Sequence, residues 1–326
     1  MPIMTLSQIS EHTYYMPGAN NLGVIATSNG GAIAIDTGLD KDTARRFRKA
    51  IDEAGLTLRA IISTHHHADH IGGNDYLLRN TPDVRLHAPP LEATFIEYPL
   101  LEPTYLNYGA SPITPLRTRW LMAKGTPVNH IIGETEAIIA GQSFAYEIEG
   151  VPLEIIGLPG HSRAQIGVVY EGVCFAADGF FGESIINKHG ILYAHDIALQ
   201  LATFDRLMQR SEAWYLPGHG DLTPASAIQT VLAANRAATE HATNLVLAAV
   251  AQSGDTTAIT ARVLQAFEQE IAATAGETSL PAQTIPQYAI FAGAVVAHLS
   301  YLEQQGVVEV VLAERQLLWQ RKGAAA

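Results

Sequence analysis

The chain has 326 residues, of which 48% are hydrophobic and 16% are charged, and this composition excludes an intrinsically disordered protein. With 20 Lys and Arg against 32 Asp and Glu, the formal net charge is −12, so we do not expect a nucleic-acid partner. The single cysteine, Cys174, excludes an internal disulfide, and the length predicts one large domain with a smaller appendage.

The chain carries no recognisable export or membrane signal. Its first residues have neither the basic segment nor the apolar run of a signal peptide. No stretch reaches the ~18 uninterrupted apolar residues of a membrane span. We therefore expect a soluble, cytoplasmic protein that does not contact a membrane.

The first 80 residues predict strands that alternate with helices, a pattern typical of an α/β layer. The turn at 28–31 joins two apolar strands into a hairpin, and Gly55 ends the first helix. The strands cover 23–27, 32–36 and 58–64, and the helices cover 41–54 and a segment that ends at Arg79.

A similar pattern returns in the second part of the chain. We expect strands over 153–158, 166–170, 173–177 and 213–216 and a helix over about 196–210. A His or an Asp stands just after the strands that end at residues 64, 158, 177 and 216. Because open α/β sheets assemble their sites at the carboxyl ends of strands, this repetition predicts one site built from several strand ends.

Two regions differ from this pattern. Residues 90–135 are rich in Pro, Tyr and Leu without a clear period, which is typical of a lid or an oligomer contact. After residue 225 the chain is Ala-rich and predicts helices over 226–253, 256–275 and 288–304, followed by two strands over 307–319. We therefore predict a catalytic domain over 1–225, with the insertion 90–135, and a helical C-terminal domain over 226–326.

The most informative string is His65-His66-His67-Ala68-Asp69-His70. On an extended backbone, His65 and His67 lie on one side, which leaves Asp69 and His70 available to a second centre. Imidazole nitrogens and carboxylate oxygens are ligands that Zn²⁺ prefers, and a bound water then ionises near neutral pH. The string therefore predicts a metal site.

Three further residues stand at strand ends in glycine-rich or apolar surroundings. His161 lies between Gly160 and Ser162, Asp178 ends an apolar strand, and His219 lies between two glycines. Together with the His-rich string they offer seven candidate ligands, namely His65, His67, Asp69, His70, His161, Asp178 and His219.

These strings resemble the signatures of the metallo-β-lactamase superfamily over residues 10–225. The matching segments, in chain order, are 36–38 (Asp-Thr-Gly), 65–70, 158–162 (Leu-Pro-Gly-His-Ser), 175–179 (Phe-Ala-Ala-Asp-Gly) and 217–220 (Pro-Gly-His-Gly). The resemblance implies an α/β protein of the αββα sandwich type, with four layers and a dinuclear metal site at the edge of two sheets. The segment that begins Ala297-His298-Leu299, reaches Gly306 and continues through the predicted strand pair to Trp319 is similar to the winged-helix extension of hydrolases related to human β-lactamase-like protein 2.

The resemblance also implies roles for individual residues. One metal ion would be held by His65, His67 and His161, a second by Asp69, His70 and His219, and Asp178 would bridge the two. Asp36 is expected to orient a ligand histidine, as such sites generally require. His66 points away from its neighbours in an extended chain, so we expect it to pack or support rather than to bind a metal.

Two adjacent cations predict hydrolysis by a shared hydroxide, without a covalent protein intermediate. Asp69 would orient this nucleophile and carry its proton. A complete second site with a bridging Asp178 resembles the glyoxalase II, lactonase and ribonuclease Z branches. Because the negative net charge disfavours nucleic acid, we expect a carboxylic ester, lactone or thioester as substrate. Lys188 could anchor a substrate carboxylate, and Tyr105, Tyr108 and Trp120 of the insertion are candidate contacts for an apolar acyl group.

Two alternatives use the same residues. One is a phosphodiesterase or ribonuclease, which the winged-helix resemblance favours and the negative charge disfavours. The other is a mononuclear iron sulfur dioxygenase. For the hydrolase we expect two divalent ions, Zn²⁺ first, with Mn or Fe also compatible with these ligands. A small-molecule substrate and a homodimer complete the interpretation.

Overall fold

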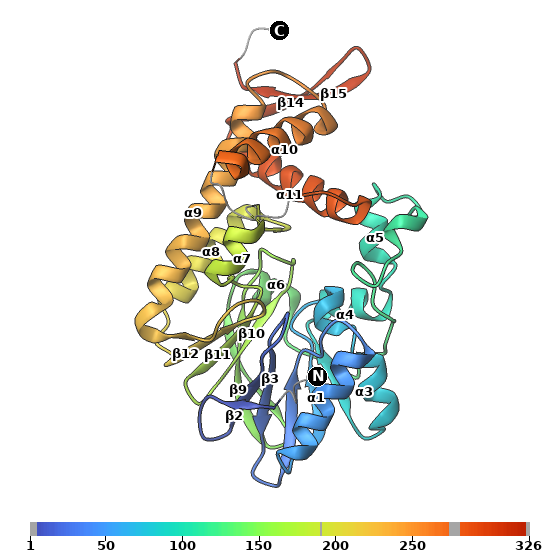
Figure 1. The fold of residues 1–326 in the computed structure, drawn as a ribbon, viewed down its shortest axis with the longest axis vertical. Coiled ribbons are helices and arrows are strands. Elements are labelled where there is room, and N and C mark those ends of the chain that lie inside the picture. Colours follow the sequence, from blue (N-terminus) through green and yellow to red (C-terminus); the bar gives the residue numbers. More distant parts are fainter. Residues whose placement is uncertain (1–4, 190, 274–280, 324–326) are drawn as a thin grey trace.

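The computed structural model describes residues 5–189, 191–273 and 281–323, without the side chains of residues 188, 189, 272 and 273. Most of the described chain folds into two large sheets that pack face to face (Figure 1). The first sheet has the order β1 (Ser7–Gln8), β2 (Thr13–Met16), β3 (Leu22–Ala26), β4 (Gly31–Ile35), β5 (Thr57–Ile62), β6 (Arg85–Ala88), β7 (His130–Ile131). The second has the order β13 (Thr223–Pro224), β12 (Trp214–Pro217), β11 (Val173–Ala177), β10 (Ile166–Tyr170), β9 (Val151–Gly157), β8 (Ser143–Ile148).

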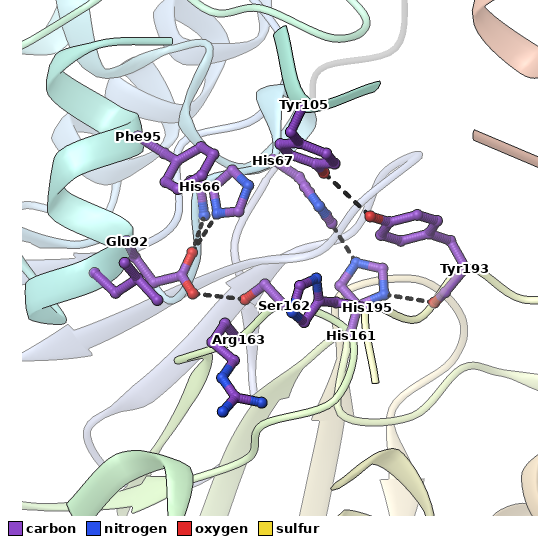
Figure 2. A pocket seen from close by; sticks show the side chains of 11 residues that line it. His66, His67, Glu92, Phe95, Tyr105, His161, Ser162, Arg163, Tyr193 and His195 are labelled. Carbon is purple, nitrogen blue, oxygen red and sulfur yellow. Dashed lines mark hydrogen bonds and ion pairs between the residues drawn. The ribbon is translucent and has the colours of Figure 1, made fainter. Parts of the chain in front are cut away.

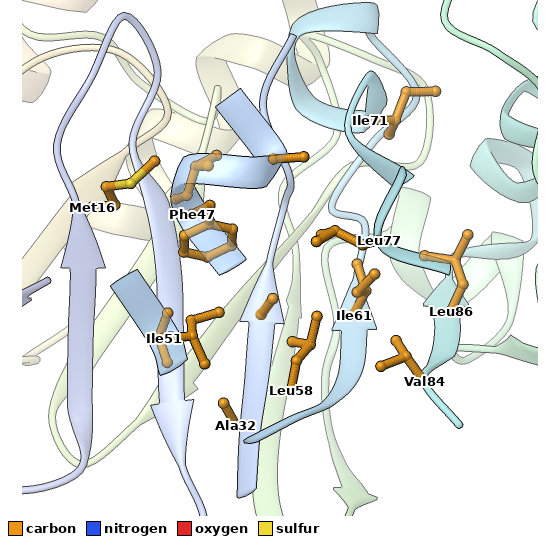
Figure 3. Close-up of a cluster of buried hydrophobic side chains, with 14 of the residues drawn as sticks. Met16, Ala32, Phe47, Ile51, Leu58, Ile61, Ile71, Leu77, Val84 and Leu86 are labelled. Atoms are coloured by element: carbon orange, nitrogen blue, oxygen red, sulfur yellow. The ribbon is translucent and has the colours of Figure 1, made fainter. Parts of the chain in front are cut away.

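Helices cover the outer face of each sheet. On the first sheet, Phe47 and Ile51 of α1 (Lys41–Glu53) and Leu77 of α3 (Asn74–Asn80) pack against strand residues such as Ile61 (Figure 3). On the second sheet, Phe204 of α8 (Ile197–Met208) packs in a cluster with strand residues of β9, β11 and β12. A third cluster joins the two sheets. These layers confirm the expected αββα sandwich.

Local signals explain why the outer helices begin and end where they do. Asp40 caps α1, since its side chain accepts a hydrogen bond from the backbone N–H of Thr43. Gly55 follows this helix with a φ of 77°, a conformation that glycine adopts readily. Asp196 caps α8 in the same way, through the N–H of Leu199.

The insertion is more regular than its sequence suggests. It contains α4 (Pro90–Glu97), α5 (Leu101–Leu106), a 3₁₀ turn (η1, Thr114–Leu116), and strand β7 at the sheet edge. Proline starts α4, where its missing N–H costs nothing. Ala93 and Ile96 of this helix belong to the core under the first sheet. The insertion is therefore partly built into the sandwich; its use as a lid or an oligomer contact stays a prediction.

The C-terminal part contains the predicted helices and strands, at one end of the molecule (Figure 1). They are α9 (Ala225–Ala249), α10 (Thr256–Ala273), α11 (Ile285–Gln304) and the hairpin β14 (Val308–Ala313) and β15 (Gln316–Arg321). Ile228 of α9 packs in the cluster of the second sheet, whereas Val246 packs with α10 and α11. One continuous helix thus joins both cores; the domain boundary and the winged-helix comparison stay predictions.

Among the described helices, α11 is the one that is long and apolar enough to cross a membrane by length and composition. Its Phe291, Val295 and Leu299 are buried in the C-terminal core. A buried core helix passes the same test, so this finding is weak evidence for a membrane span.

Candidate metal centre

Parallel pairing brings the predicted strand ends together. Strand β4 pairs in parallel with β5, so Asp36 and the His-rich string leave the first sheet at one edge. Strand β11 pairs in parallel with β12, which places Asp178 and His219 together at the edge of the second sheet. After β5 the chain reaches the short helix α2 (Ala68–Ile71), which carries Asp69 and His70.

The seven predicted ligands lie in one group. Within the described residues, two of the clusters that could hold a metal ion are His65, His67 and His161, and Asp69, His70 and His219, with the ligand atoms of each cluster within 4.8 Å of one another. Asp178 lies between them: its Oδ2 is 3.1 Å from His161 Nε2 and 3.6 Å from His219 Nε2, and its Oδ1 is 3.3 Å from His70 Nε2. A third cluster, Asp36 with His65 and His70, overlaps both.

The hydrogen-bond partners of the histidines leave ring nitrogens free to bind a cation. Nδ1 of His70 donates to Asp36 Oδ2 at 2.8 Å, Nδ1 of His161 to the carbonyl of Tyr193 at 2.9 Å, and Nδ1 of His219 to the carbonyl of Ala19 at 2.7 Å. Each Nε2 is therefore the ring nitrogen that can bind a cation when the imidazole is neutral. The expected orienting role of Asp36 agrees with its contact to His70.

Buried atoms without partners test whether a metal ion fits. His65 Nε2, His70 Nε2 and Asp178 Oδ1 are buried and have no hydrogen-bond partner among the described residues. Leaving such atoms unsatisfied is costly, and native structures usually explain each case. Nitrogen and oxygen donors that converge in this way suit a divalent cation. The residues present therefore fit a metal centre.

The electrostatics of the two clusters differ. Burial, and then neighbouring imidazoles, lowers the pKa of His65 and His67 well below the ordinary histidine value, so both are neutral. Burial also lowers the pKa of His219, but Asp178 and Asp69 outweigh it and raise that pKa to about 9. His65 and His67 can thus bind a cation without losing a proton, whereas a cation in the second cluster must displace a proton from His219.

Two glycines allow the loops of the site to pack closely. A Cβ on Gly72 would lie 1.9 Å from the carbonyl oxygen of Leu39, and a Cβ on Gly73 would lie 2.4 Å from that of Thr37. Any side chain at these positions would push α2 and α3 away from the end of β4. The Gly-Gly pair therefore permits this close approach.

A cavity of about 390 Å³ opens beside the first cluster (Figure 2). It is lined by His66, His67, Leu91, Glu92, Phe95, Tyr105, His161, Ser162, Arg163, Tyr193 and His195. The hydroxyls of Tyr105 and Tyr193 form a hydrogen bond of 3.1 Å, which joins the insertion to the loop before α8. Both rings and Phe95 give the wall an aromatic character.

The predicted substrate contacts fall in different places. Tyr105 lines the cavity, but Tyr108 is 90% exposed and Trp120 is 58% exposed, and neither lines it. Sequence reasoning placed all three together because they share the insertion, but α5 directs only Tyr105 toward the site. Lys188 belongs to α7 (Glu183–His189), and its side chain lies outside the described residues.

Sequence reasoning singled out neither Glu92 nor His195, yet both line the cavity. Glu92 is 1% exposed and accepts a hydrogen bond from Nδ1 of His66, whose ring packs against Phe95 with centroids 4.3 Å apart. Burial raises the pKa of Glu92, but His66 outweighs this effect and lowers it, so the carboxylate is charged. A single glutamate after Pro90 carries no sequence signal for this role.

Comparisons with known proteins agree with this geometry. The family model described as "Metallo-beta-lactamase superfamily" matches residues 15–219. Hydroxyacylglutathione hydrolases are similar to parts of the chain. The protein of Synechococcus sp. WH7803 is 28% identical over 39% of this chain and 36% of its own length, and that of Thiobacillus denitrificans is 27% identical over 54% and 51%. The chain thus spans about half or less of the length of these curated relatives.

Solved structures show the same fold over nearly the whole chain. A metallo-beta-lactamase family protein from Thermus thermophilus has a TM-score of 0.69 at 19% identity and covers 95% of this chain and 99% of its own. A beta-lactamase domain protein from Burkholderia ambifaria has a TM-score of 0.67 at 17% identity, with coverage of 97% and 93%. At these identities the likeness establishes the fold alone.

Proposed function

The chain belongs to the metallo-β-lactamase superfamily, and we propose that it is a dinuclear metal-dependent hydrolase of carboxylic esters, lactones or thioesters. The observation that carries this proposal is the position of Asp178 between two His/Asp clusters, within reach of histidines from both. We assign the first ion to His65, His67 and His161, the second to Asp69, His70 and His219, and the bridge to Asp178. Zn²⁺ is the proposed metal, because these donors suit it.

When bound, the two ions would lower the pKa of a water molecule and polarise the scissile carbonyl. The protein's own contribution to proton transfer is assigned to Asp69. Its Oδ2 lies 3.0 Å from His219 Nε2, and 35% of its side chain is exposed, so it can reach a substrate. Burial raises the pKa of Asp69, but His70 and His219 outweigh it, so the carboxylate is charged and can accept a proton at Oδ2.

The cavity supports an acyl substrate. Leu91, Phe95 and Tyr105 offer an apolar surface beside the first cluster, where an acyl or aromatic group would be desolvated. The curated relatives are named for hydrolysis of a hydroxyacylglutathione, which is a thioester, and this supports a thioester among the candidate substrates. Tyr105 is retained as a proposed substrate contact. A homodimer and a cytoplasmic location stay predictions.

Metal analysis followed by a substrate screen tests the proposal. Elemental analysis of the purified protein should give close to two divalent ions per chain. The metal-loaded protein should hydrolyse p-nitrophenyl esters, lactones or thioesters, and exhaustive chelation should abolish the activity. Cleavage of bis-p-nitrophenyl phosphate without any acyl hydrolysis would favour the phosphodiesterase, whereas one iron per chain with oxygen consumption would favour the sulfur dioxygenase.

A further inference from the structure

Glu92 is a buried carboxylate whose hydrogen bonds are all directed to two loops of the metal centre. Its Oε2 accepts from the backbone N–H of His66 at 3.1 Å and from the His66 ring. Its Oε1 accepts from Ser162 Oγ at 2.8 Å and from the backbone N–H of Ala164 at 2.8 Å. A charge buried this deeply is tolerated only where hydrogen bonds compensate for lost water, and four donors do so here.

The four donors lie in segments that carry predicted ligands. His66 stands between His65 and His67, in the loop that follows β5 of the first sheet. Ser162 and Ala164 follow His161, in the loop between β9 and β10 of the second sheet. Figure 2 shows Glu92 reaching from α4 to His66 on one side and to Ser162 on the other. The Glu92 carboxylate is therefore hydrogen-bonded to both loops that carry the ligands of the first cluster.

We propose that Glu92 is a positioning residue that sets the spacing of the first cluster by holding these two loops together. His67 Nδ1 and His161 Nε2 lie 2.8 Å apart, and Glu92 holds a neighbour of each. The inference rests on the metal centre of the proposed function but not on its substrate. Residues that hydrogen-bond a ligand directly typically change metal affinity by roughly 10–100-fold when removed. Glu92 bonds to the neighbours of ligands, so we expect the lower end of this range, about 10-fold.

The second cluster has supports of its own. His70 is held by Asp36, and His219 by the carbonyl of Ala19. Asn20 donates a side-chain hydrogen bond to the carbonyl of Asp69. The four hydrogen bonds of Glu92 involve none of these residues, so its loss should weaken the first cluster selectively. General destabilisation of the fold would weaken both clusters together.

The substitution Glu92→Gln tests this selectivity, because it keeps the shape but places an NH₂ group against N–H donors. Two parent variants show which cluster the substitution weakens. His219→Ala removes a proposed ligand of the second cluster, and His161→Ala removes a proposed ligand of the first. Titration of metal-free protein with Co²⁺, followed by its visible spectrum, should show about 10-fold weaker binding for Glu92→Gln in the His219→Ala background. In the His161→Ala background, where Co²⁺ occupies the second cluster, Glu92→Gln should change the Co²⁺ affinity by less than about 3-fold, because Glu92 contacts no support of that cluster.

Milder and matched variants complete the experiment. Ser162→Ala removes one of the four donors and should weaken Co²⁺ binding in the same direction by less than Glu92→Gln. Glu212→Gln is the control, since Glu212 is a buried glutamate that pairs with Arg210 and forms no hydrogen bond with the described residues of either loop. Its first-cluster affinity should match that of the parent. Circular dichroism and the urea midpoint establish that each variant is folded.

The outcomes separate this inference from the proposed function. If folded Glu92→Gln binds Co²⁺ as tightly as its parent in both backgrounds, Glu92 does not position the cluster. Equal weakening in both backgrounds, or failure of Glu92→Gln and Ser162→Ala alike to fold, would also overturn the inference by showing a general structural role. If the unsubstituted protein binds no divalent ion, both proposals fail, whereas metal binding without acyl hydrolysis contradicts the proposed function alone.

Discussion

Gly218 lies so close to Asp178 that a Cβ built on it would be 2.2 Å from the Asp178 Oδ1 atom. The same Cβ would be 2.8 Å from His70 Cε1. The backbone cannot retreat easily, because the Gly218 N–H donates to the carbonyl of Ala177 at 2.7 Å and its carbonyl accepts from Asn21 at 2.7 Å. Glycine is therefore the residue that allows the chain after β12 to pass beside the proposed bridging carboxylate.

Gly218→Ala should displace Asp178 and His70 and so disturb metal binding and catalysis. We expect kcat/KM to fall by about 100-fold or more, equivalent to ~3 kcal/mol of transition-state stabilisation. Steady-state kinetics with metal in excess measures this effect. Gly293→Ala is the control, since a Cβ there meets only ordinary contacts of 3.5 Å or longer. Wild-type kinetics in Gly218→Ala would contradict the packing argument.

Asp178→Asn should remove the charge that faces histidines of both clusters. An amide is a poor ligand for two cations at once, so we expect loss of at least one ion and about a 100-fold or greater fall in hydrolysis. Metal content after dialysis, measured by elemental analysis, provides the check. The exposed Asp83 offers a matched Asp→Asn control that should retain both ions. Full retention of two ions in Asp178→Asn would argue against a bridging role.

Phe95→Ala should enlarge the cavity and remove apolar surface from the proposed acyl site. Loss of an aromatic contact costs roughly 1.5–3 kcal/mol, so kcat/KM for an aromatic ester should fall about 10–100-fold. A short acetyl ester, which does not reach the wall, should be less affected. Tyr108→Ala, which removes an exposed ring outside the cavity, is the control. Equal effects of both variants would place the acyl group elsewhere.

Glu102 predicts a dependence of stability on pH. Burial raises its pKa from the ordinary value of 4.5 to about 8, so the folded protein holds a proton that the unfolded chain has lost between these pH values. The contribution of Glu102 to the free energy of unfolding is therefore fully present below pH 4.5 and decreases as the pH rises to about 8. The total decrease is about 5 kcal/mol at most. Glu102→Gln cannot ionise and should resist urea better than the parent at pH 9, with little difference at pH 5.

Urea unfolding of the metal-free protein at both pH values measures this effect. Glu268→Gln, a change of an exposed glutamate on α10, is the control and should follow the parent. The difference in urea midpoint between Glu102→Gln and the parent should be larger at pH 9 than at pH 5. An equal difference at both pH values would show that the pKa of Glu102 is not raised in the folded state.

Metal binding should release protons. The pKa of His219 is raised to about 9, against burial, by Asp178 and Asp69, so its imidazole carries a proton at pH 7 that a cation must displace. Affinity for the second ion should therefore rise with pH up to about 9 and fall toward pH 6. Calorimetric titrations in two buffers of different ionisation enthalpy count the protons released. Binding without proton release would show that His219 is neutral in the metal-free protein.

The sequence by itself determined most of the secondary structure and the residues of the two clusters that could hold metal ions. The apolar strands, the turns at glycine and the helix caps are local features, so their signals lie within a few residues. His65, His161, Asp178 and His219 could be predicted because each follows a strand end, and the ends of parallel strands meet at one edge.

Only the tertiary structure decided the contacts between residues that are far apart in the chain. Glu92 reaches a loop 26 residues before it and another 70 residues after it, and no local pattern encodes such distances. For the same reason, the sequence alone did not distinguish Tyr105, which lines the cavity, from Tyr108, which is exposed to solvent three residues later. The direction of each side chain depends on how α4 and α5 pack against the sandwich, and that packing is decided by the whole fold.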